Sequence, residues 1–208
     1  MTPTMTICVA TSNPGKAREF ARLLPASVRV VTLAEVGGTS PEEDGDTFRE
    51  NALLKARAAA PFADAALADD SGLVVDALQG APGVYSARYG GDGLTDADRV
   101  QLLLSNMATV ADDARTARFV SAAAFVSGDI TIVVEGTVEG TIGYAPQGEH
   151  GFGYDPIFII ADAEAGDANG QTMAQLEVHV KNAISHRGRA YRTLLGELRA
   201  QGVVTIPA

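Results

Sequence analysis

The sequence has a single cysteine, no tryptophan and fewer basic than acidic residues, and these scarcities exclude several classes of protein. One cysteine, Cys8, cannot form an intrachain disulfide, and its apolar neighbours predict a small buried side chain rather than a nucleophile. The 16 lysine and arginine residues against 26 aspartate and glutamate residues give a net charge of −10, which disfavours a nucleic-acid partner. A small anionic ligand is still compatible with this charge, because a few placed cations, backbone amides and a metal act locally.

Long apolar runs are also missing. No segment reaches the roughly 18 consecutive apolar residues of a membrane-spanning helix. The residues before Lys16 include neither a basic leader nor a long apolar stretch, which argues against a secretory signal. We therefore expect a soluble, cytoplasmic chain without a membrane partner. A length of 208 residues predicts a single domain over residues 1–208, with two lobes and no separable linker.

Helical and strand patterns alternate along the chain, and this alternation predicts an α/β fold around a mixed sheet. Predicted strands cover residues 6–11, 28–33, 66–69 with an extended continuation at 73–75, two strands between 116 and 138 that turn at Gly128-Asp129, and 157–160. Predicted helices cover residues 17–24, 51–60 behind a capping box at Thr47 and Glu50, 95–107, and 187–201, where Gly202 ends the last helix.

The turn from Thr11 to Lys16 lies between a predicted strand and a predicted helix. Free backbone amides and the helix dipole at such a turn can hold phosphate groups, and Lys16 adds a positive charge. The turn is too short for the usual P-loop, and Ala17 follows Lys16 where that loop has Ser or Thr. Strand-to-helix turns with Asn, Pro and Gly are common, so the turn alone is a weak signal.

Two acidic pairs, Glu42-Glu43 in a loop and Asp69-Asp70 at a strand end, are candidates for a magnesium site. Mg²⁺ prefers oxygen ligands and is usually held by one or two carboxylates together with substrate phosphates. A further carboxylate can activate the attacking water. Without further context, the two pairs are more typical of a solvated loop and a turn.

Two later segments have the composition of a base-binding site. The segment from Gly151 to Pro156 combines aromatic residues that can stack on a base with glycines that allow close approach. The segment from Lys181 to Arg187 gathers a cation, a hydroxyl, an imidazole and a guanidinium at the predicted start of the last helix. An ordinary turn with core aromatics and a solvated helix entry are the structural alternatives.

Together these segments resemble one family, the inosine triphosphate pyrophosphatases, also called XTP/dITP diphosphatases or non-standard purine NTP pyrophosphatases. Six segments carry the resemblance in order along the chain: residues 11–16 (Thr-Ser-Asn-Pro-Gly-Lys), 42–52 (Glu-Glu-Asp-Gly-Asp-Thr-Phe-Arg-Glu-Asn-Ala), 68–73 (Ala-Asp-Asp-Ser-Gly-Leu), 80–89 (Gly-Ala-Pro-Gly-Val-Tyr-Ser-Ala-Arg-Tyr), 151–158 (Gly-Phe-Gly-Tyr-Asp-Pro-Ile-Phe) and 185–187 (Ser-His-Arg). Six such segments within 208 residues outweigh the structural alternative for each one taken alone.

The resemblance implies an elongated, two-lobed α/β fold with a long mixed sheet flanked by helices and a nucleotide cleft between the lobes. It also implies a cytoplasmic homodimer that hydrolyses ITP, dITP and XTP to a nucleoside monophosphate and pyrophosphate with Mg²⁺. The chemistry that the resemblance implies is in-line attack of water on a phosphorus, with cleavage of the bond between the α and β phosphates.

The resemblance also assigns roles to individual positions. Glu42 and Asp70 match the metal ligands, Asp70 and Lys16 match the catalytic positions, and Asp70 is the expected base, with Glu43 and Asp69 as its neighbours. Phe152 is expected to stack on the base and Arg187 to donate to its 6-oxo group. The positions matched to substrate binding are Thr11, Ser12, Asn13, Pro14, Gly15, Lys16, Ser71, Phe152, Gly153, Tyr154, Asp155, Lys181, His186 and Arg187.

The sequence departs from the family pattern in one region. Gln175 and the pair His179-Val180 stand where relatives commonly have acidic residues, which puts the local loop electrostatics in doubt but not the reaction. His150 and His179 are expected at the solvated surface. Two other functions remain open: a pyrophosphohydrolase for modified pyrimidines, and a nucleotide-binding regulator without turnover.

Overall fold

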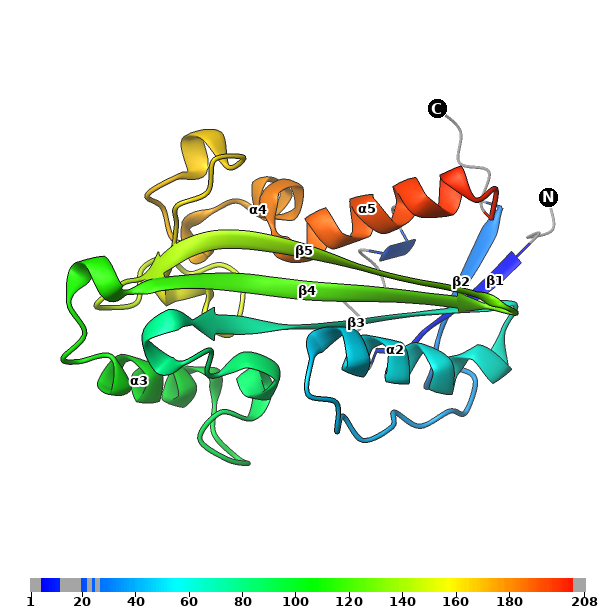
Figure 1. The fold of residues 1–208 in the computed structure, drawn as a ribbon, viewed down its shortest axis with the longest axis horizontal. Helices are drawn as coiled ribbons and strands as arrows, with labels where there is room; N and C mark the ends of the chain where they lie inside the picture. Colours follow the sequence, from blue (N-terminus) through cyan, green and yellow to red (C-terminus); the bar gives the residue numbers. More distant parts are fainter. Residues whose placement is uncertain (1–4, 12–19, 22–23, 25–26, 204–208) are drawn as a thin grey trace. The chain divides into compact units, whose positions relative to one another are not determined.

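Six strands form one mixed sheet in the order β2-β1-β3-β4-β5-β6 within the part of the chain that the computed structural model describes, residues 5–11, 20–21, 24 and 27–203 (Figure 1). The strands are β1 (Met5–Val9), β2 (Val28–Thr32), β3 (Ala65–Val75), β4 (Thr116–Ser127), β5 (Ile130–Ile142) and β6 (Phe158–Ile160). β1 pairs in parallel with both β2 and β3, whereas β5 and β6 are antiparallel. The α/β fold with a mixed sheet is therefore confirmed.

Helices follow several of these strands, and their starts obey the capping signals of the sequence. They are α2 (Phe48–Ala59), α3 (Asp96–Asn106), α4 (Val178–Ile184) and α5 (His186–Ala200). Thr47 caps α2 in a reciprocal capping box with Glu50, as predicted, and Thr95 does the same for α3 with Asp98. No helix among the described residues is long and apolar enough to cross a membrane.

The chain divides into two compact units, each assembled from separate segments. Unit 1 contains Met1–Asp70, Ala122–Glu135 and Ala190–Ala208, and unit 2 contains Ser71–Ser121 and Gly136–Arg189.

In unit 1, helices cover both faces of the sheet. Ala65 and Leu67 of β3 pack in one cluster with Tyr191 and Leu194 of α5. Strand residues alternate between faces, so Asp70 lies on the other face, where side chains of α2 contact it. The helix α2 therefore covers the face of the sheet that presents Asp70. Cys8 is fully buried, as predicted, and burial raises the pKa of its thiol.

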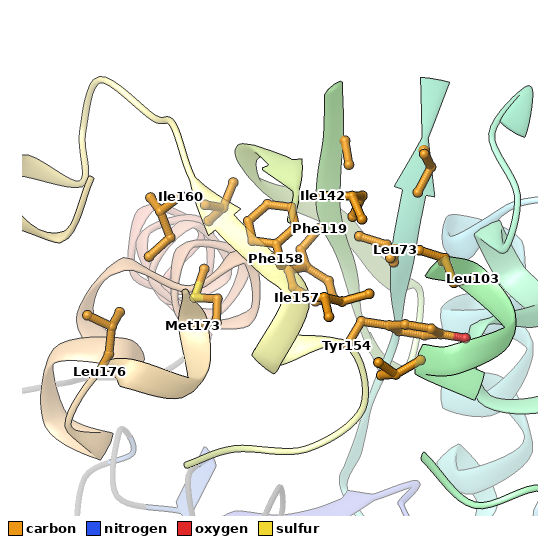
Figure 2. Close-up of a cluster of buried hydrophobic side chains, with 14 of the residues drawn as sticks. Leu73, Leu103, Phe119, Ile142, Tyr154, Ile157, Phe158, Ile160, Met173 and Leu176 are labelled. Atoms are coloured by element: carbon orange, nitrogen blue, oxygen red, sulfur yellow. The ribbon is translucent and has the colours of Figure 1, made fainter. Parts of the chain in front are cut away.

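In unit 2, an apolar cluster surrounds the last strand (Figure 2). The ring of Phe158 packs at 4.5 Å from the ring of Phe119, and Leu103 of α3 and Met173 are fully buried in the same cluster. This cluster therefore supports the segments before and after β6. The loops on this cluster include residues 151–156, which the sequence singled out.

Two details of the predicted elements differ from the structure. Residues 65–75 form one unbroken strand, because Ser71 and Gly72 keep an extended backbone. Lys181 lies in a separate short helix, α4, and not at the start of the last helix. Ser185 separates α4 from α5 because its φ of −63° and ψ of 153° are extended. The predicted helix at 17–24 and the turn at 12–16 lie largely outside the described residues.

Candidate functional site

The predicted site residues fall into two groups, one in each unit. Glu42, Glu43 and Asp70 belong to unit 1, and the residues from Ser71 onward belong to unit 2. Asp70 and Ser71 are consecutive residues of β3.

In unit 1, a buried lysine joins two of the acidic residues, and we call Glu43, Asn51, Lys55 and Asp70 the acidic group. The Lys55 Nζ lies 2.8 Å from Oε1 of Glu43 and 2.9 Å from Oδ1 of Asp70. The side-chain amide of Asn51 donates to Oδ2 of Asp70 at 3.3 Å. Both oxygens of Asp70 therefore have a donor, and the carboxylate is fixed in position.

The helix α2 places both donors of the acidic group. Asn51 and Lys55 are four residues apart, so they lie on the same face of α2, together with the buried residues Ala52 and Ala56. Asn51 also accepts a hydrogen bond from the backbone N–H of Gly45 at 2.8 Å. This bond fixes the end of the acidic loop, just after Glu42 and Glu43, against helix α2.

Burial dominates the electrostatics of Asp70, which is 7% exposed. Burial raises the pKa of the Asp70 carboxyl above its usual range, although the Lys55 ammonium acts in the opposite direction. Burial also acts to lower the pKa of Lys55, but the charges of Asp70 and Glu43 outweigh it and raise that pKa. Lys55 is therefore a permanent cation beside a carboxylate that has increased affinity for a proton.

The remaining predicted residues of unit 1 have varied environments. Glu42 is exposed, Glu43 is partly buried, and Asp69 is 3% exposed. By strand alternation, Asp69 points to the opposite face of the sheet from Asp70. Thr11 follows β1 directly, and its N–H donates to the Val9 carbonyl at 2.9 Å. Ser12, Asn13, Pro14, Gly15 and Lys16 lie outside the described residues.

The acidic group fits a magnesium ion by its chemistry. Its carboxylates offer oxygen donors, and Glu43 and Asp70 already hold a positive charge, the Lys55 ammonium, between them. The described residues include no cluster of three or more His, Cys, Asp or Glu side chains arranged for a metal. Mg²⁺ commonly needs only one or two carboxylates and takes its other ligands from water and phosphate.

In unit 2, cations gather over an exposed aromatic ring. The ring of Phe152 is 56% exposed, with the Lys181 Nζ at 5.0 Å and the Arg187 guanidinium carbon at 5.9 Å from its centroid. We call Ser71, Phe152, Asp155, Lys181, His186 and Arg187 the aromatic-basic group. An exposed ring beside two cations can stack on a heterocycle and donate hydrogen bonds to its oxygens.

Asp155 organises the loop of this group. Its Oδ2 accepts hydrogen bonds from the Phe152 N–H at 2.8 Å and from the Lys181 ammonium, and the residue is only 3% exposed. Gly151 has a φ of +81°, and a Cβ there would collide with both Asp155 and Lys181. Gly151 is therefore required for the loop to close around this ion pair.

The start of α5 supplies the other side chains. The His186 ring stacks on the Phe119 ring with centroids 4.8 Å apart and an interplanar angle of 14°. The Arg187 guanidinium donates to the Ser71 hydroxyl at 3.2 Å. Both residues are 8% exposed, so unit 2 holds them in defined positions.

Residues in the middle of the 151–156 loop are held by contacts with other parts of unit 2. Tyr154 is 5% exposed in the cluster of Figure 2, its hydroxyl donates to the Ser86 carbonyl at 2.9 Å, and burial raises its pKa. The Gly153 N–H donates to Asp96 at 2.9 Å.

A pocket opens beside this loop. Its volume of about 360 Å³ is at the small end of the range for small-molecule sites. Its walls include Phe152, Gly153, Asp96, Gln101, Glu149 and the exposed His150.

Two members of the acidic group, Asn51 and Lys55, were not predicted from the sequence. Their contacts with Asp70 span 19 and 15 residues, so a local pattern does not identify Asp70 as their partner. The sequence nevertheless contained a signal for these two residues, because a lysine and an asparagine four residues apart share a helix face with alanines.

Gln175, which departs from the family pattern, has a structural role. Its side chain accepts a hydrogen bond from the Thr172 N–H at 2.8 Å and closes a capping box there.

The comparisons with known proteins agree with one another. The model of the Ham1 family matches residues 7–197. The dITP/XTP pyrophosphatase of an Exiguobacterium species is 48% identical over 199 residues, which cover 93% of this chain and 97% of that protein. The dITP/XTP pyrophosphatase of Bacillus subtilis is 47% identical over 196 residues, covering 92% of this chain and 96% of that protein.

A solved structure gives the same result. The HAM1 protein from Coxiella burnetii superposes with a TM-score of 0.86 at 38% identity, covering 95% of this chain and 100% of that one. The matches confirm the resemblance found in the sequence and extend over both units. This chain belongs to the Ham1 family.

Proposed function

We propose that this chain is a nucleoside-triphosphate pyrophosphohydrolase that converts dITP, ITP and XTP to their monophosphates and pyrophosphate. The observation that carries the proposal is the fixed, buried carboxylate of Asp70 between Lys55 and Asn51. This carboxylate belongs to a chain whose relatives at 47–48% identity are named dITP/XTP pyrophosphatases.

Unit 1 supplies the chemistry of hydrolysis in this proposal. Asp70 accepts a proton from the attacking water, whose oxygen forms a bond to phosphorus as the bond to the leaving pyrophosphate breaks. Lys55 holds Asp70 at 2.9 Å and offsets negative charge near it. The predicted roles of Thr11 and of the turn up to Lys16 in holding the triphosphate are part of the proposal.

Magnesium is the proposed cofactor, with Asp70 and Glu42 as its ligands and Glu43 and Asp69 as their neighbours. Bound there, Mg²⁺ would offset the charge of the phosphate oxygens. Loss of turnover in EDTA and its recovery on addition of Mg²⁺ is the expected result.

In this proposal, the residues of unit 2 determine which nucleobase is bound. Phe152 offers an exposed ring for stacking, and Lys181 and Arg187 offer donors beside that ring. A 6-oxo purine accepts from such donors, whereas the 6-amino group of adenine leaves them unpaired. GTP also has a 6-oxo group, and its 2-amino group is expected to be left unpaired or crowded in the site. The proposed location is the cytoplasm, the proposed assembly is a homodimer, and no nucleic acid is expected as a partner. Sedimentation should give about twice the chain mass of 21.5 kDa.

The test is pyrophosphate release from ITP, dITP, XTP, ATP, GTP, CTP and UTP in the presence of Mg²⁺. We expect kcat/KM for the first three to exceed the others by about a hundredfold or more. Equal rates on all seven would point to a modified-base substrate, and no release would point to a nucleotide binder without turnover. The Asp70→Asn variant, purified in parallel, controls for a contaminating phosphatase.

A further inference from the structure

Another ion pair, formed by residues outside all the predicted site residues, holds the start of α5 in unit 2. The Arg189 guanidinium donates to both carboxylate oxygens of Asp162, from NH1 at 2.8 Å and from NH2 at 2.9 Å. Asp162 is 9% exposed, and the Arg189 side chain is 15% exposed. A bidentate pair of this kind fixes the direction of a guanidinium as well as its position.

The carboxylate of Asp162 is itself held by the backbone. The Glu139 N–H donates to its Oδ2 at 3.0 Å, and the Glu164 N–H donates to its Oδ1 at 2.9 Å. The Asp162 N–H donates to the side chain of Asn169 at 2.8 Å. Four hydrogen bonds therefore converge on one carboxylate, which connects β5 and the loop after β6 to α5.

Arg189 lies within one helical turn of His186 and Arg187. Its NH1 also donates to the Thr137 carbonyl at 2.8 Å, so α5 is tied to β5 directly as well as through Asp162. The Ser185 hydroxyl accepts the Gly188 N–H at 3.1 Å in the same turn. This turn cannot rotate without breaking these bonds, and its rotation would move both His186 and Arg187.

We infer that Asp162 and Arg189 are positioning residues for base recognition: they fix the first turn of α5 so that Arg187 and His186 meet the base in a defined orientation. The inference rests on the proposed function. Neither residue touches substrate in this account, since each acts through α5. Loss of the pair should impair discrimination between bases more than it impairs the hydrolytic step.

The test compares kcat and KM for ITP and for ATP in the wild-type chain and in the Asp162→Asn and Arg189→Lys variants. For Asp162→Asn, the ratio of kcat/KM for ITP to that for ATP should fall about tenfold, mainly through a higher KM for ITP, because a charged donor loses its orientation. Arg189→Lys keeps a cation opposite Asp162 but loses the bidentate geometry, so the ratio should also fall, by less than in Asp162→Asn. Both substrates are measured on one sample, so the folded fraction cancels from the ratio.

Arg118→Gln is the matched control. Arg118 also bridges two carboxylates of unit 2, Asp76 and Glu139, but it is not on α5, and its loss should leave the ratio unchanged. An unchanged ratio in Asp162→Asn, or an equal fall in Arg118→Gln, would overturn the inference. Wild-type turnover of ITP tests the proposed function separately, and its absence would overturn both.

Discussion

Two buried aspartates of this protein face a cation, yet their pKa values move in opposite directions. Burial raises the pKa of Asp70 in unit 1 in spite of Lys55, whereas the hydrogen bonds from Arg189 lower the pKa of Asp162 in unit 2 to about 2. The difference follows from hydrogen bonding to the charged form. Asp162 accepts a bidentate guanidinium and two backbone N–H groups, and Asp70 accepts from one ammonium and one amide.

In the proposed function, this difference assigns Asp162 to structure and Asp70 to chemistry. A carboxylate with all its lone pairs satisfied stabilises the fold but has little capacity to accept a proton. A buried carboxylate with fewer donors keeps that capacity, which the proposed reaction requires. Variants of Asp70 should therefore affect mainly turnover, and variants of Asp162 should affect mainly the free energy of unfolding.

The largest expected effect is on turnover. Asp70→Asn should lower kcat for ITP about a thousandfold, because the amide cannot accept the proton of the attacking water. Binding of ITP, measured by calorimetry, should remain. Asp129→Asn, an exposed position in the hairpin turn of unit 1, is the control and should keep full turnover. Wild-type turnover in Asp70→Asn would remove Asp70 from its assigned role.

Removal of the cation beside Asp70 should cost stability. Lys55→Gln leaves the charges of Glu43 and Asp70 in a buried setting without their partner, and we expect the free energy of unfolding to fall by about 3 kcal/mol. Urea denaturation measures this change. Arg49→Gln is the comparison, because the Arg49–Glu135 pair is largely exposed and should contribute less than about 1 kcal/mol. Equal losses in the two variants would contradict a special role for burial.

In unit 2, the expected effect is on base recognition. Arg187→Gln should weaken binding of inosine monophosphate about a hundredfold and change binding of adenosine monophosphate much less, because a charged donor to the 6-oxo group is lost. Calorimetry with both nucleotides gives the two values. Arg192→Gln, an exposed position further along α5, should change neither. A parallel loss of both affinities would mean that Arg187 does not recognise the base.

The smallest expected effect is the pH dependence that Asp162 confers on stability. Its folded pKa of about 2 lies below the ordinary 3.8, so the ion pair stabilises the fold above pH 4 and loses this contribution as the pH falls toward 2. The shift corresponds to about 2 kcal/mol. Urea denaturation of wild type and Asp162→Asn should differ by this amount at pH 7 and converge near pH 2. A constant difference across this range would refute the assignment.

Much of the fold could be predicted from local sequence signals. Thr47 with Glu50 marks the start of α2, and Gly128-Asp129 marks the hairpin between β4 and β5. Helix α4 was missed and Lys181 was placed at the start of the last helix, because the extended backbone of Ser185 between α4 and α5 has no proline or glycine to indicate it. Local signals report the start of a helix better than a short interruption.

The candidate site could be predicted only where residues carry a recognisable segment. Asp70, Phe152 and Arg187 were identified through the family resemblance, whereas Lys55 and Arg189 depend on partners 15 and 27 residues away. Charged residues on helices are usually solvated, so only the folded chain reveals that Lys55 is buried, Arg189 is partly buried, and both are paired. Tertiary contacts of this kind are the part that sequence patterns leave undetermined.

The most direct test of this account measures kcat for ITP and the free energy of unfolding side by side in Asp70→Asn and Asp162→Asn. We predict a crossed result. Asp70→Asn loses about a thousandfold in kcat with stability changed by less than about 1 kcal/mol, and Asp162→Asn loses about 2 kcal/mol of stability with kcat within about threefold of wild type. A loss of kcat in Asp162→Asn as large as that in Asp70→Asn, or full turnover in Asp70→Asn, would contradict the assignment of chemistry to one aspartate and of structure to the other.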